Sequence, residues 1–406
     1  MIRLVSVAAA IALVLLDGAA VARSAGGHRA GSPDRDRPEP DFGAPSGLDH
    51  DYETYLQFKD ELQTRYGLEY TFELSLMPQW TAAKGGSEVG NFIHSPSFSW
   101  TPFADTAAGS GTFTGSLQQN RFWTGRDTAA VQRRVGFLAP PSDWPGNQTN
   151  VNQLTYTHTL PGAWQWLAVT VGQYSFGNYD QNDYAGNAQT NFVNYALAQN
   201  ATQTYTTSDL GGFVEATTPD DQWTFAGGIQ GATNLAGDDI STRGLATGRL
   251  ATFAAVQFTA LPLGANYSLM WYRQPAVPAQ PSASHGLSLS MTQAIAKNLG
   301  VLLRVNTATG SASPIASSVA GGIVADDPLA RGEPDQIGLG IAWNQTNLKA
   351  LGQPARRSEL VAELYANYAV FRGLKIGPDI QLYDHPALAT GAGMAAVFTL
   401  RATASF

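Results

Sequence analysis

Residues 398–406 read Phe-Thr-Leu-Arg-Ala-Thr-Ala-Ser-Phe. Apolar or small side chains alternate strictly with polar ones along this segment. Because successive side chains of a β-strand point to opposite faces, a strand with this sequence has one apolar wall and one polar wall. Such a strand suits a sheet that meets a nonpolar medium on one side and water on the other.

The same period of two extends back along the chain. It is clearest in residues 359–368, 336–344, 222–230 and 68–76. A water-soluble β-sandwich would also alternate, so the pattern alone does not decide between a sandwich and a membrane barrel. The lengths of the connections favour the membrane barrel, because short turns such as 160–163 and 218–221 intervene between long polar stretches. Those stretches are residues 123–149, 175–209, 232–249, 274–285 and 346–357. One rim with tight turns and another with long loops is typical of an outer-membrane barrel.

The spacing therefore predicts an all-β fold, a 16-stranded antiparallel transmembrane β-barrel with a short N-terminal periplasmic helix. The expected strands are 68–77, 92–101, 112–122, 150–160, 164–174, 210–218, 222–231, 250–260, 265–273, 286–296, 299–307, 314–325, 336–345, 358–371, 375–383 and 392–406. An even number of strands places both ends of the barrel chain on the periplasmic side. The terminal Phe406 resembles the assembly signal of Gram-negative barrels, which predicts a contact with the barrel-assembly machinery.

The N-terminal region divides into three predicted segments before the barrel at 67–406. Residues 1–22 combine Arg3, an apolar run and small residues, as a cleaved signal peptide does. Residues 23–50 lack apolar periodicity and are expected to form a flexible periplasmic tail. Residues 51–66 have helical spacing of apolar side chains and end before a glycine, which predicts a short amphipathic helix. We therefore expect export to the outer membrane of a Gram-negative bacterium.

Composition excludes several classes of function. Charged residues make up 14% of the chain, well below the average of soluble domains, and apolar residues 44%. The formal net charge is −8 and basic residues do not cluster, so no nucleic-acid partner is expected. The absence of cysteine removes disulfides, thiolate zinc sites and thiol nucleophiles.

Motifs for catalysis are also absent. No H-E-x-x-H, Walker A or G-x-S-x-G sequence occurs, so we expect no catalytic residues, no metal and no cofactor. The Asp pairs at 220–221, 238–239 and 326–327 fit turns better than calcium sites. An outer-membrane esterase or phospholipase would need a paired serine and histidine, and nothing pairs His158 or His285 with a serine. We predict that the protein is not an enzyme.

Several stretches carry a family resemblance. Residues 171–177, Val-Gly-Gln-Tyr-Ser-Phe-Gly, end a predicted strand and lead through the Asp/Asn-rich residues 180–185 to Thr-Asn-Phe-Val-Asn at 190–194. Arg-Gly-Glu-Pro-Asp-Gln-Ile-Gly-Leu-Gly at 331–340 and Glu-Leu-Tyr-Ala-Asn-Tyr at 363–368 follow, and so does Gly-Pro-Asp-Ile-Gln at 377–381. The chain from about residue 50 onward resembles the carbohydrate-selective porins of the OprB type. The resemblance implies diffusion of sugars through a 16-stranded pore.

Three departures from the family pattern concern the solute rather than the fold, one of them a final strand that is less charged than in the family. Tyr52 and Tyr55 stand where the family has a Trp-Gly-Gly entry to the first helix, and residues 384–388 replace an Asn-Pro-Gly type loop. The predicted inward positions are mostly Gln, Asn, Thr, Ser and Gly, which independently favours a neutral solute over an ion.

The few charges on the polar wall are candidates for a constriction. Alternation places six of them toward the lumen, and a seventh lies where a strand leads into a long loop: Glu73, Glu215, Arg304, Glu363, Asp379 and Arg401, with Arg121. We expect carboxylates and arginines to pair across the wall as an eyelet of both signs, the alternative being wall salt bridges without solute contact. Four loop aromatics are candidates for stacking on sugar rings or for the rim girdle: Trp123, Tyr174, Phe176 and Tyr179.

The predicted partners are small sugars and outer-membrane lipid. The sequence leaves open whether the barrels act singly or as a homotrimer. A general or export channel, or a structural barrel without sugar selectivity, is the alternative function. A wide polysaccharide exporter would be expected to have a strongly charged lumen, which this sequence does not predict.

Overall fold

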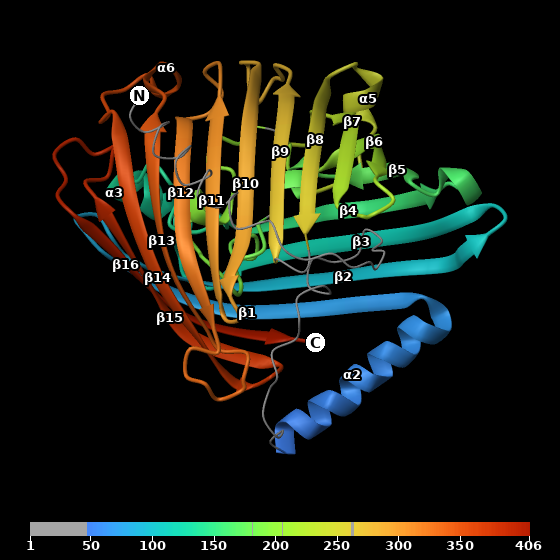
Figure 1. Ribbon diagram of the computed structural model, residues 1–406. Coiled ribbons are helices and arrows are strands. Elements are labelled where there is room, and N and C mark those ends of the chain that lie inside the picture. The colour runs from blue at the N-terminus through green and yellow to red at the C-terminus, as the bar shows by residue number, and fades with distance from the viewer. Residues whose placement is uncertain (1–46, 181, 205, 261–263) are drawn as a thin grey trace.

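The computed structural model describes residues 47–180, 182–204, 206–260 and 264–406. Over these residues the chain forms sixteen antiparallel strands that close into one barrel, with β1 paired to β16 (Figure 1). The predicted fold class is thus confirmed. The expected signal peptide at 1–22 and all but the end of the expected tail at 23–50 lie outside the described residues.

The strands follow one another around the barrel in chain order. Their bounds are β1 Leu68–Ala82, β2 Glu88–Thr106, β3 Gly109–Phe122, β4 Gln148–Thr159, β5 Leu167–Tyr174, β6 Asp209–Thr217, β7 Trp223–Gly231, β8 Leu250–Ala260, β9 Ala265–Gln274, β10 Ser284–Ala296, β11 Leu299–Ala308, β12 Ile315–Asp326, β13 Gln336–Thr346, β14 Ser358–Phe371, β15 Leu374–Asp384 and β16 Ala395–Ser405. Each pairs with its two neighbours, as expected when tight turns and long loops alternate.

Strand boundaries lie within three residues of the predicted ones except in β1, which ends at Ala82 and not at residue 77, and in β2. Strand β2 runs from Glu88 to Thr106, whereas the predicted strand was 92–101. It includes Pro102, which cannot donate to a strand ladder. The pairing of β2 with β3 shifts register between Trp100 and Phe103. Pro102 lies within this irregularity, where a missing N–H costs little, so the strand can continue past it.

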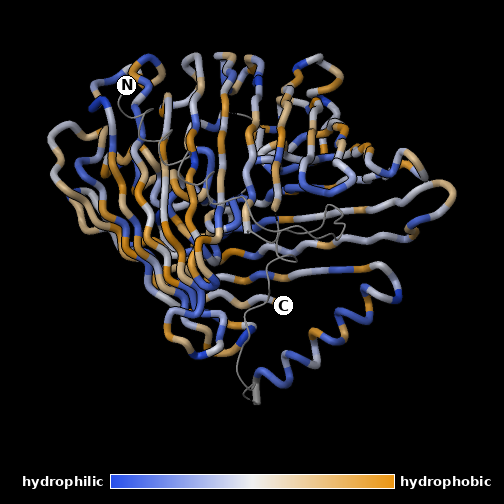
Figure 2. The backbone as a smooth tube through the Cα atoms, viewed as in Figure 1, coloured by the Kyte–Doolittle hydropathy of each residue, from blue (hydrophilic) through white to orange (hydrophobic). Residues whose placement is uncertain are grey.

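The two walls of the barrel differ as the alternation predicts. On β14, Leu364 is 47% exposed on the outer wall while its neighbour Glu363 is 1% exposed on the inner wall. Figure 2 shows hydrophobic and hydrophilic residues alternating along the strands. In a membrane the exposed apolar side chains of the outer wall face lipid, which removes the cost of leaving them in water.

Helix α2, Gly47–Tyr66, begins four residues earlier than predicted and lies at the end of the barrel that also holds the C-terminus (Figure 1). Helices α5, Arg243–Ala246, and α6, Leu348–Leu351, lie at the opposite end, where the long loops are. Gly67 ends α2 in the left-handed conformation, with a φ of 65°, and its N–H donates to the carbonyl of Gln63. Within the described residues, no helix combines the length and apolar character needed to cross a membrane.

Helix α2 is attached where the two ends of the barrel chain meet. The Tyr52 hydroxyl donates to the carbonyl oxygen of Ser405 over 3.0 Å, and the Tyr55 ring lies 6.4 Å from that of Phe406. Glu53 forms an ion pair with Arg372, in the turn between β14 and β15. The helix therefore contacts the first strand, the last strand and the turn before it.

Candidate functional site: two loops folded into the barrel

Two of the long connections fold inward against the barrel wall. The first joins β3 to β4 and contains helix α3, Thr128–Val135. The second joins β5 to β6 and contains the 3-10 helix η2, Phe176–Asp180, and helix α4, Tyr195–Ala198. We call them loop A (residues 123–147) and loop B (residues 175–208). Both contact side chains of the inner wall, so they narrow the interior of the barrel.

Loop B is held by Glu363 of β14. One carboxylate oxygen accepts from the backbone N–H of Val193 over 2.5 Å, and the other from that of Asn194 over 2.9 Å. Hydrogen bonds to a charged acceptor contribute roughly 1.5–3 kcal/mol each. The two stretches 190–194 and 363–368, which carry much of the family resemblance, thus meet in space.

Loop A is held in the same way by Glu359, which the sequence analysis did not single out. Its carboxylate accepts from the N–H groups of Leu138, Ala139 and Ala387 over 2.8, 2.8 and 2.9 Å. Glu359 is 1% exposed. The signal that could have found it was its spacing from Glu363, because residues four apart on a strand share one face.

The two inward arginines hold carbonyl groups of loop B. Arg401 Nη1 donates to the carbonyl oxygens of Ala188 and Asn191 over 3.0 and 2.6 Å. Arg304 donates to those of Leu197 and Asp180 over 3.2 and 3.1 Å. The planar guanidinium carries several donors, so one side chain can satisfy two carbonyls that the turns of the loop leave unpaired.

Loop B covers four of the predicted charges, of which Glu363, Asp379 and Arg401 lie on the neighbouring strands β14, β15 and β16, while Arg304 lies on β11. Arg304, Glu363 and Asp379 are 1% exposed and Arg401 is 2% exposed. Glu363, Asp379 and Arg401 interact electrostatically with one another, whereas Arg304 interacts with Asp180 of loop B and Asp143 of loop A. The four predicted charges point inward as alternation expects, yet the structure places them behind loop B and not on its free surface. The sequence could not reveal this, because nothing in a strand pattern tells whether a loop covers it.

Inward glycines make room for loop B on the wall. A Cβ atom added to Gly340 would lie 2.8 Å from Phe192 and 2.9 Å from Leu197, and one added to Gly300 would lie 2.2 Å from Tyr184. The loop side chains fill the spaces that these glycines leave. Some strands have apolar residues on their outward face and glycine at inward positions. In the sequence, this pattern indicates a wall against which a loop can pack closely.

Loops A and B also hold each other. The N–H of Tyr195 donates to the carbonyl of Pro140 over 3.1 Å, and Gln199 Nε2 donates to Asp143 over 3.0 Å. Burial raises the pKa of Asp143 to about 6, against the opposing effects of the Gln199 hydrogen bond and the nearby Arg304 charge. The contact between the loops thus contains a group that titrates near neutral pH.

Three of the four candidate aromatics form a cluster at the start of loop B. Tyr174, Phe176 and Tyr179 are 1%, 0% and 7% exposed. Phe176 and Tyr179 stack on Phe253 of β8 with centroid distances of 5.6 and 5.0 Å. These rings join the start of loop B to the inner wall, and little of their surface faces a solute. The prediction weighed sugar stacking against a rim girdle, and this buried cluster is a third arrangement.

The remaining candidates keep some exposure. Glu73 is partly exposed and accepts from Asn187 Nδ2 of loop B over 3.0 and 3.1 Å. Glu215 is partly exposed and hydrogen-bonds the Tyr179 hydroxyl. Arg121 pairs in register with Phe92 and shares its outer face, where it donates to the carbonyl of Gln148.

Trp123 lies just past the end of β3. It is 55% exposed, and its ring packs over Gly90, where an added Cβ would lie 2.4 Å from the indole. The structure thus leaves Trp123 open to solvent or lipid at the rim that carries the long loops.

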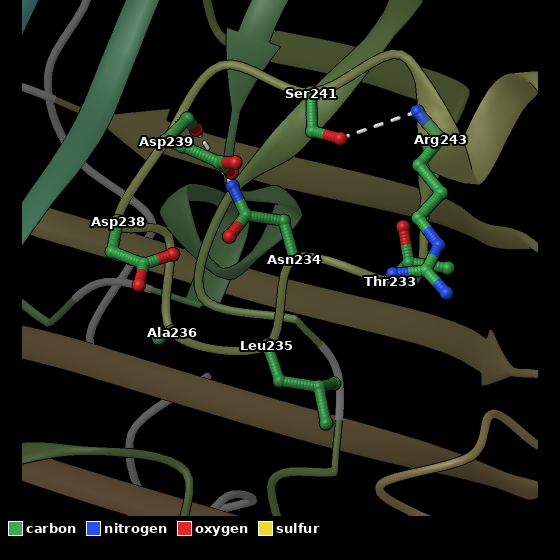
Figure 3. A pocket seen from close by; sticks show the side chains of 8 residues that line it. All are labelled: Thr233, Asn234, Leu235, Ala236, Asp238, Asp239, Ser241 and Arg243. Atoms are coloured by element: carbon green, nitrogen blue, oxygen red, sulfur yellow. Dashed lines mark hydrogen bonds between the residues drawn. The ribbon is translucent and has the colours of Figure 1, made fainter.

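A separate hollow of about 260 Å³ lies in the loop between β7 and β8, outside loops A and B (Figure 3). Asn234 Nδ2 donates to the carbonyl of Asp239 over 2.8 Å, and the Arg243 N–H donates to Ser241 Oγ over 3.3 Å. Asp238 and Asp239 both line it. Nowhere in the described parts of the chain do three His, Cys, Asp or Glu side chains gather as a metal site would need.

Comparison with solved structures identifies the architecture. A structure of Pseudomonas putida OprB determined at high pH superposes with a TM-score of 0.70 and 16% identity, covering 87% of this chain and 97% of that one. Salmonella typhi OmpF in complex with daunomycin superposes with a TM-score of 0.55 and 11% identity, covering 84% of this chain and 97% of that one. At these identities the likeness concerns the fold.

Sequence comparison is more specific. Porin AaxA of Chlamydia pneumoniae is 32% identical over 349 residues, which are 83% of this chain and 79% of the relative. Porin AaxA of Chlamydia muridarum is 28% identical over 369 residues, 85% of this chain and 79% of the relative. The profile of the carbohydrate-selective porin, OprB family, matches residues 98–406. The chain is an outer-membrane β-barrel channel and belongs to the OprB family of porins.

Proposed function

We propose that this porin lets small neutral carbohydrates diffuse passively into the periplasm. One observation carries the proposal: the inner wall that loops A and B leave accessible bears hydroxyl and amide side chains, while most inward charges hold the loops. Neutral donors and acceptors can replace the hydrogen bonds that a sugar makes to water. An ion would gain more from exposed rings of charge.

The candidate charges have a positioning role in this proposal. Arg304, Glu363 and Arg401 fix loop B, and Glu359 fixes loop A, so they set the width of the narrow part without touching the solute. Asp379 acts indirectly, through its interactions with Glu363 and Arg401. Glu73 and Glu215 are partly exposed and are the predicted charges that can meet a solute directly. Trp123 is the one candidate aromatic with a largely exposed ring.

The surroundings of the barrel are proposed from the same features. The apolar outer wall faces outer-membrane lipid. The signal peptide at 1–22 is removed during export, and the barrel-assembly machinery then recognises Phe406. The mass of the protein in detergent distinguishes single barrels from a homotrimer.

Liposome swelling tests the function directly. Purified protein in liposomes should let neutral monosaccharides enter faster than sugar phosphates of similar size, and liposomes without protein should admit neither. Equal rates for both classes would favour a general channel, and no swelling at all would favour a structural barrel. Either result would overturn the proposal.

A further inference from the structure

Three adjacent strands present hydroxyl groups to the interior at every inward position over part of their length. These positions are alternate residues 97–101 of β2, 112–116 of β3 and 155–159 of β4, and each is Ser or Thr. We call them the hydroxyl face. The register brings them side by side, with Ser99 opposite Thr114 and Thr114 opposite Thr155. Within these nine positions no charged or apolar residue occurs, and the inward Glu69 of β1 borders the face opposite Ser99.

The loops do not cover the hydroxyl face. Every member except Thr155 is partly exposed, whereas the inward residues of β14 and β16 are almost all buried. The edge of loop B is marked by Gln189, which accepts from the Ser95 hydroxyl over 2.6 Å. On the far side, Tyr179 packs against Phe213 of β6 with a centroid distance of 5.7 Å. The hydroxyl face lies between these two edges.

The face also spans the distance from the loops to the periplasmic rim. Its upper end, at Ser97, is next to Ser95, where loop B touches the wall. At its lower end the N–H of Thr101 donates to the carbonyl of Gly67, the residue that ends α2, over 2.8 Å. A solute that has passed the loops meets this face on the way out.

The hydroxyls retain capacity to bind a solute. Thr101 and Thr112 hydrogen-bond each other over 2.9 Å, and Thr157 bonds Thr170 of β5 over 2.8 Å. Each hydroxyl has one donor and two acceptor sites, so such a pair still offers one donor and several acceptors. The backbones of adjacent strands lie about 5 Å apart, and successive inward residues of one strand are about 7 Å apart. Because the wall hydroxyls are many weak and equivalent binding sites, a solute can move along the face and is not held at one position.

We propose that neutral polyhydroxylated solutes leave the constriction along the hydroxyl face, exchanging hydrogen bonds from one wall hydroxyl to the next. The proposal rests on the proposed sugar conduction and adds the path and the residues that recognise the solute. It predicts specificity for hydroxyl-rich solutes without a tight binding site.

Cysteine scanning can locate the path, because the chain contains no cysteine of its own. Ser99→Cys and Ser116→Cys should react with a charged thiol reagent, and each reaction should lower the single-channel current in a step. Thr403→Cys, on the wall that loop B covers, and Phe98→Cys, on the outer wall, are the matched controls. Reaction and current block in Thr403→Cys as fast as in Ser99→Cys would overturn the path.

Removing hydroxyls tests recognition. The double variant Thr112→Val/Thr114→Val keeps the side-chain shape and should slow the swelling rate with neutral sugars several-fold while leaving the potassium chloride conductance unchanged. Thr307→Val, on the outer wall of β11, is the control. Unchanged sugar rates in the double variant would overturn the hydroxyl path alone. Failure of the wild-type protein to admit any neutral sugar would instead overturn the proposed function, and the path with it.

Discussion

Glu359 and Glu363 lie four residues apart on the inner wall of β14, and each binds consecutive backbone N–H groups of a different loop. One strand therefore sets the position of both loops that narrow the barrel. A carboxylate with two oxygens is well suited to two adjacent N–H donors, and a neutral amide would offer one acceptor where two are needed.

Loss of either carboxylate should widen the pore. Glu363→Ala leaves the N–H groups of Val193 and Asn194 without their acceptor, and each lost bond costs roughly 1.5–3 kcal/mol. We expect a higher and noisier single-channel conductance, with Glu359→Ala acting similarly through loop A. Leu364→Ala, on the outer wall of the same strand, should behave as wild type. A conductance of Glu363→Ala equal to that of Leu364→Ala would show that the carboxylate does not hold the loop.

Charge removal should also alter ion selectivity. Arg304→Ala takes away a positive charge next to the narrow part, and Glu363→Ala takes away a negative one. Reversal potentials in a salt gradient should therefore shift in opposite directions, toward cations for Arg304→Ala and toward anions for Glu363→Ala. Both variants should weaken the block of current by sugars. If neither property changes, these residues do not shape the narrow part.

The link between loops A and B should depend on pH. The raised pKa of Asp143, about 6, means that the native state binds a proton that the unfolded chain releases near pH 4. Protonation therefore favours the native contact, which is strongest at low pH and weakens as the pH rises through about 6. Hydrogen exchange in residues 138–146, corrected for intrinsic rates, should be more protected at about pH 5 than at about pH 7.5. In Asp143→Asn this difference should vanish, and its persistence would assign it to another group.

Tags on intact cells should define the orientation. An epitope inserted near Arg243, in the exposed loop between β7 and β8, should bind antibody, whereas one in the turn at Asp220–Asp221 should not. An epitope inserted at 190–194 should also stay hidden, because this part of loop B lies inside the barrel. Labelling at Asp220–Asp221 without labelling at Arg243 would invert the topology.

The C-terminal residue should matter for assembly rather than for conduction. Phe406 exchanges two backbone hydrogen bonds with Phe72, of 2.8 and 2.9 Å, and its side chain is 37% exposed. Phe406→Ser should reduce the amount of barrel in the outer membrane while export across the inner membrane continues. Tyr55→Ala removes the ring that packs on Phe406 and serves as the control for that contact. Normal outer-membrane yield of Phe406→Ser would count against the assembly role.

The barrel could be predicted well from the sequence because the alternation of apolar and polar residues within each strand indicates what its two faces contact. Alternation along residues 359–368 distinguishes a wall that faces lipid from one that faces inward, and this needs no knowledge of distant residues. The helix before β1 was likewise predictable from local spacing, although its first turn was assigned to the tail.

The candidate site was less predictable because its contacts join distant residues. Alternation correctly turned Glu363 and Arg401 inward, but only the fold brings Val193 and Ala188 against them. Glu359 was overlooked since its role depends on the backbone of loop A. Tyr174 and Phe176 were considered only as rim or solute-binding residues, since a ring next to a loop gives no local sign that the loop will fold back over it.

The position of α2 has a consequence for the order of events in biogenesis. Its binding surface combines Tyr70 of the first strand, Ser405 of the last strand, Phe406 beyond it and Phe371 before the preceding turn. That surface is complete only when β1 has paired with β16. We therefore expect the helix to dock after the barrel has closed, so that a probe on Tyr55 would report closure. The first helix of the described residues is thus expected to dock after all the strands that follow it in the sequence.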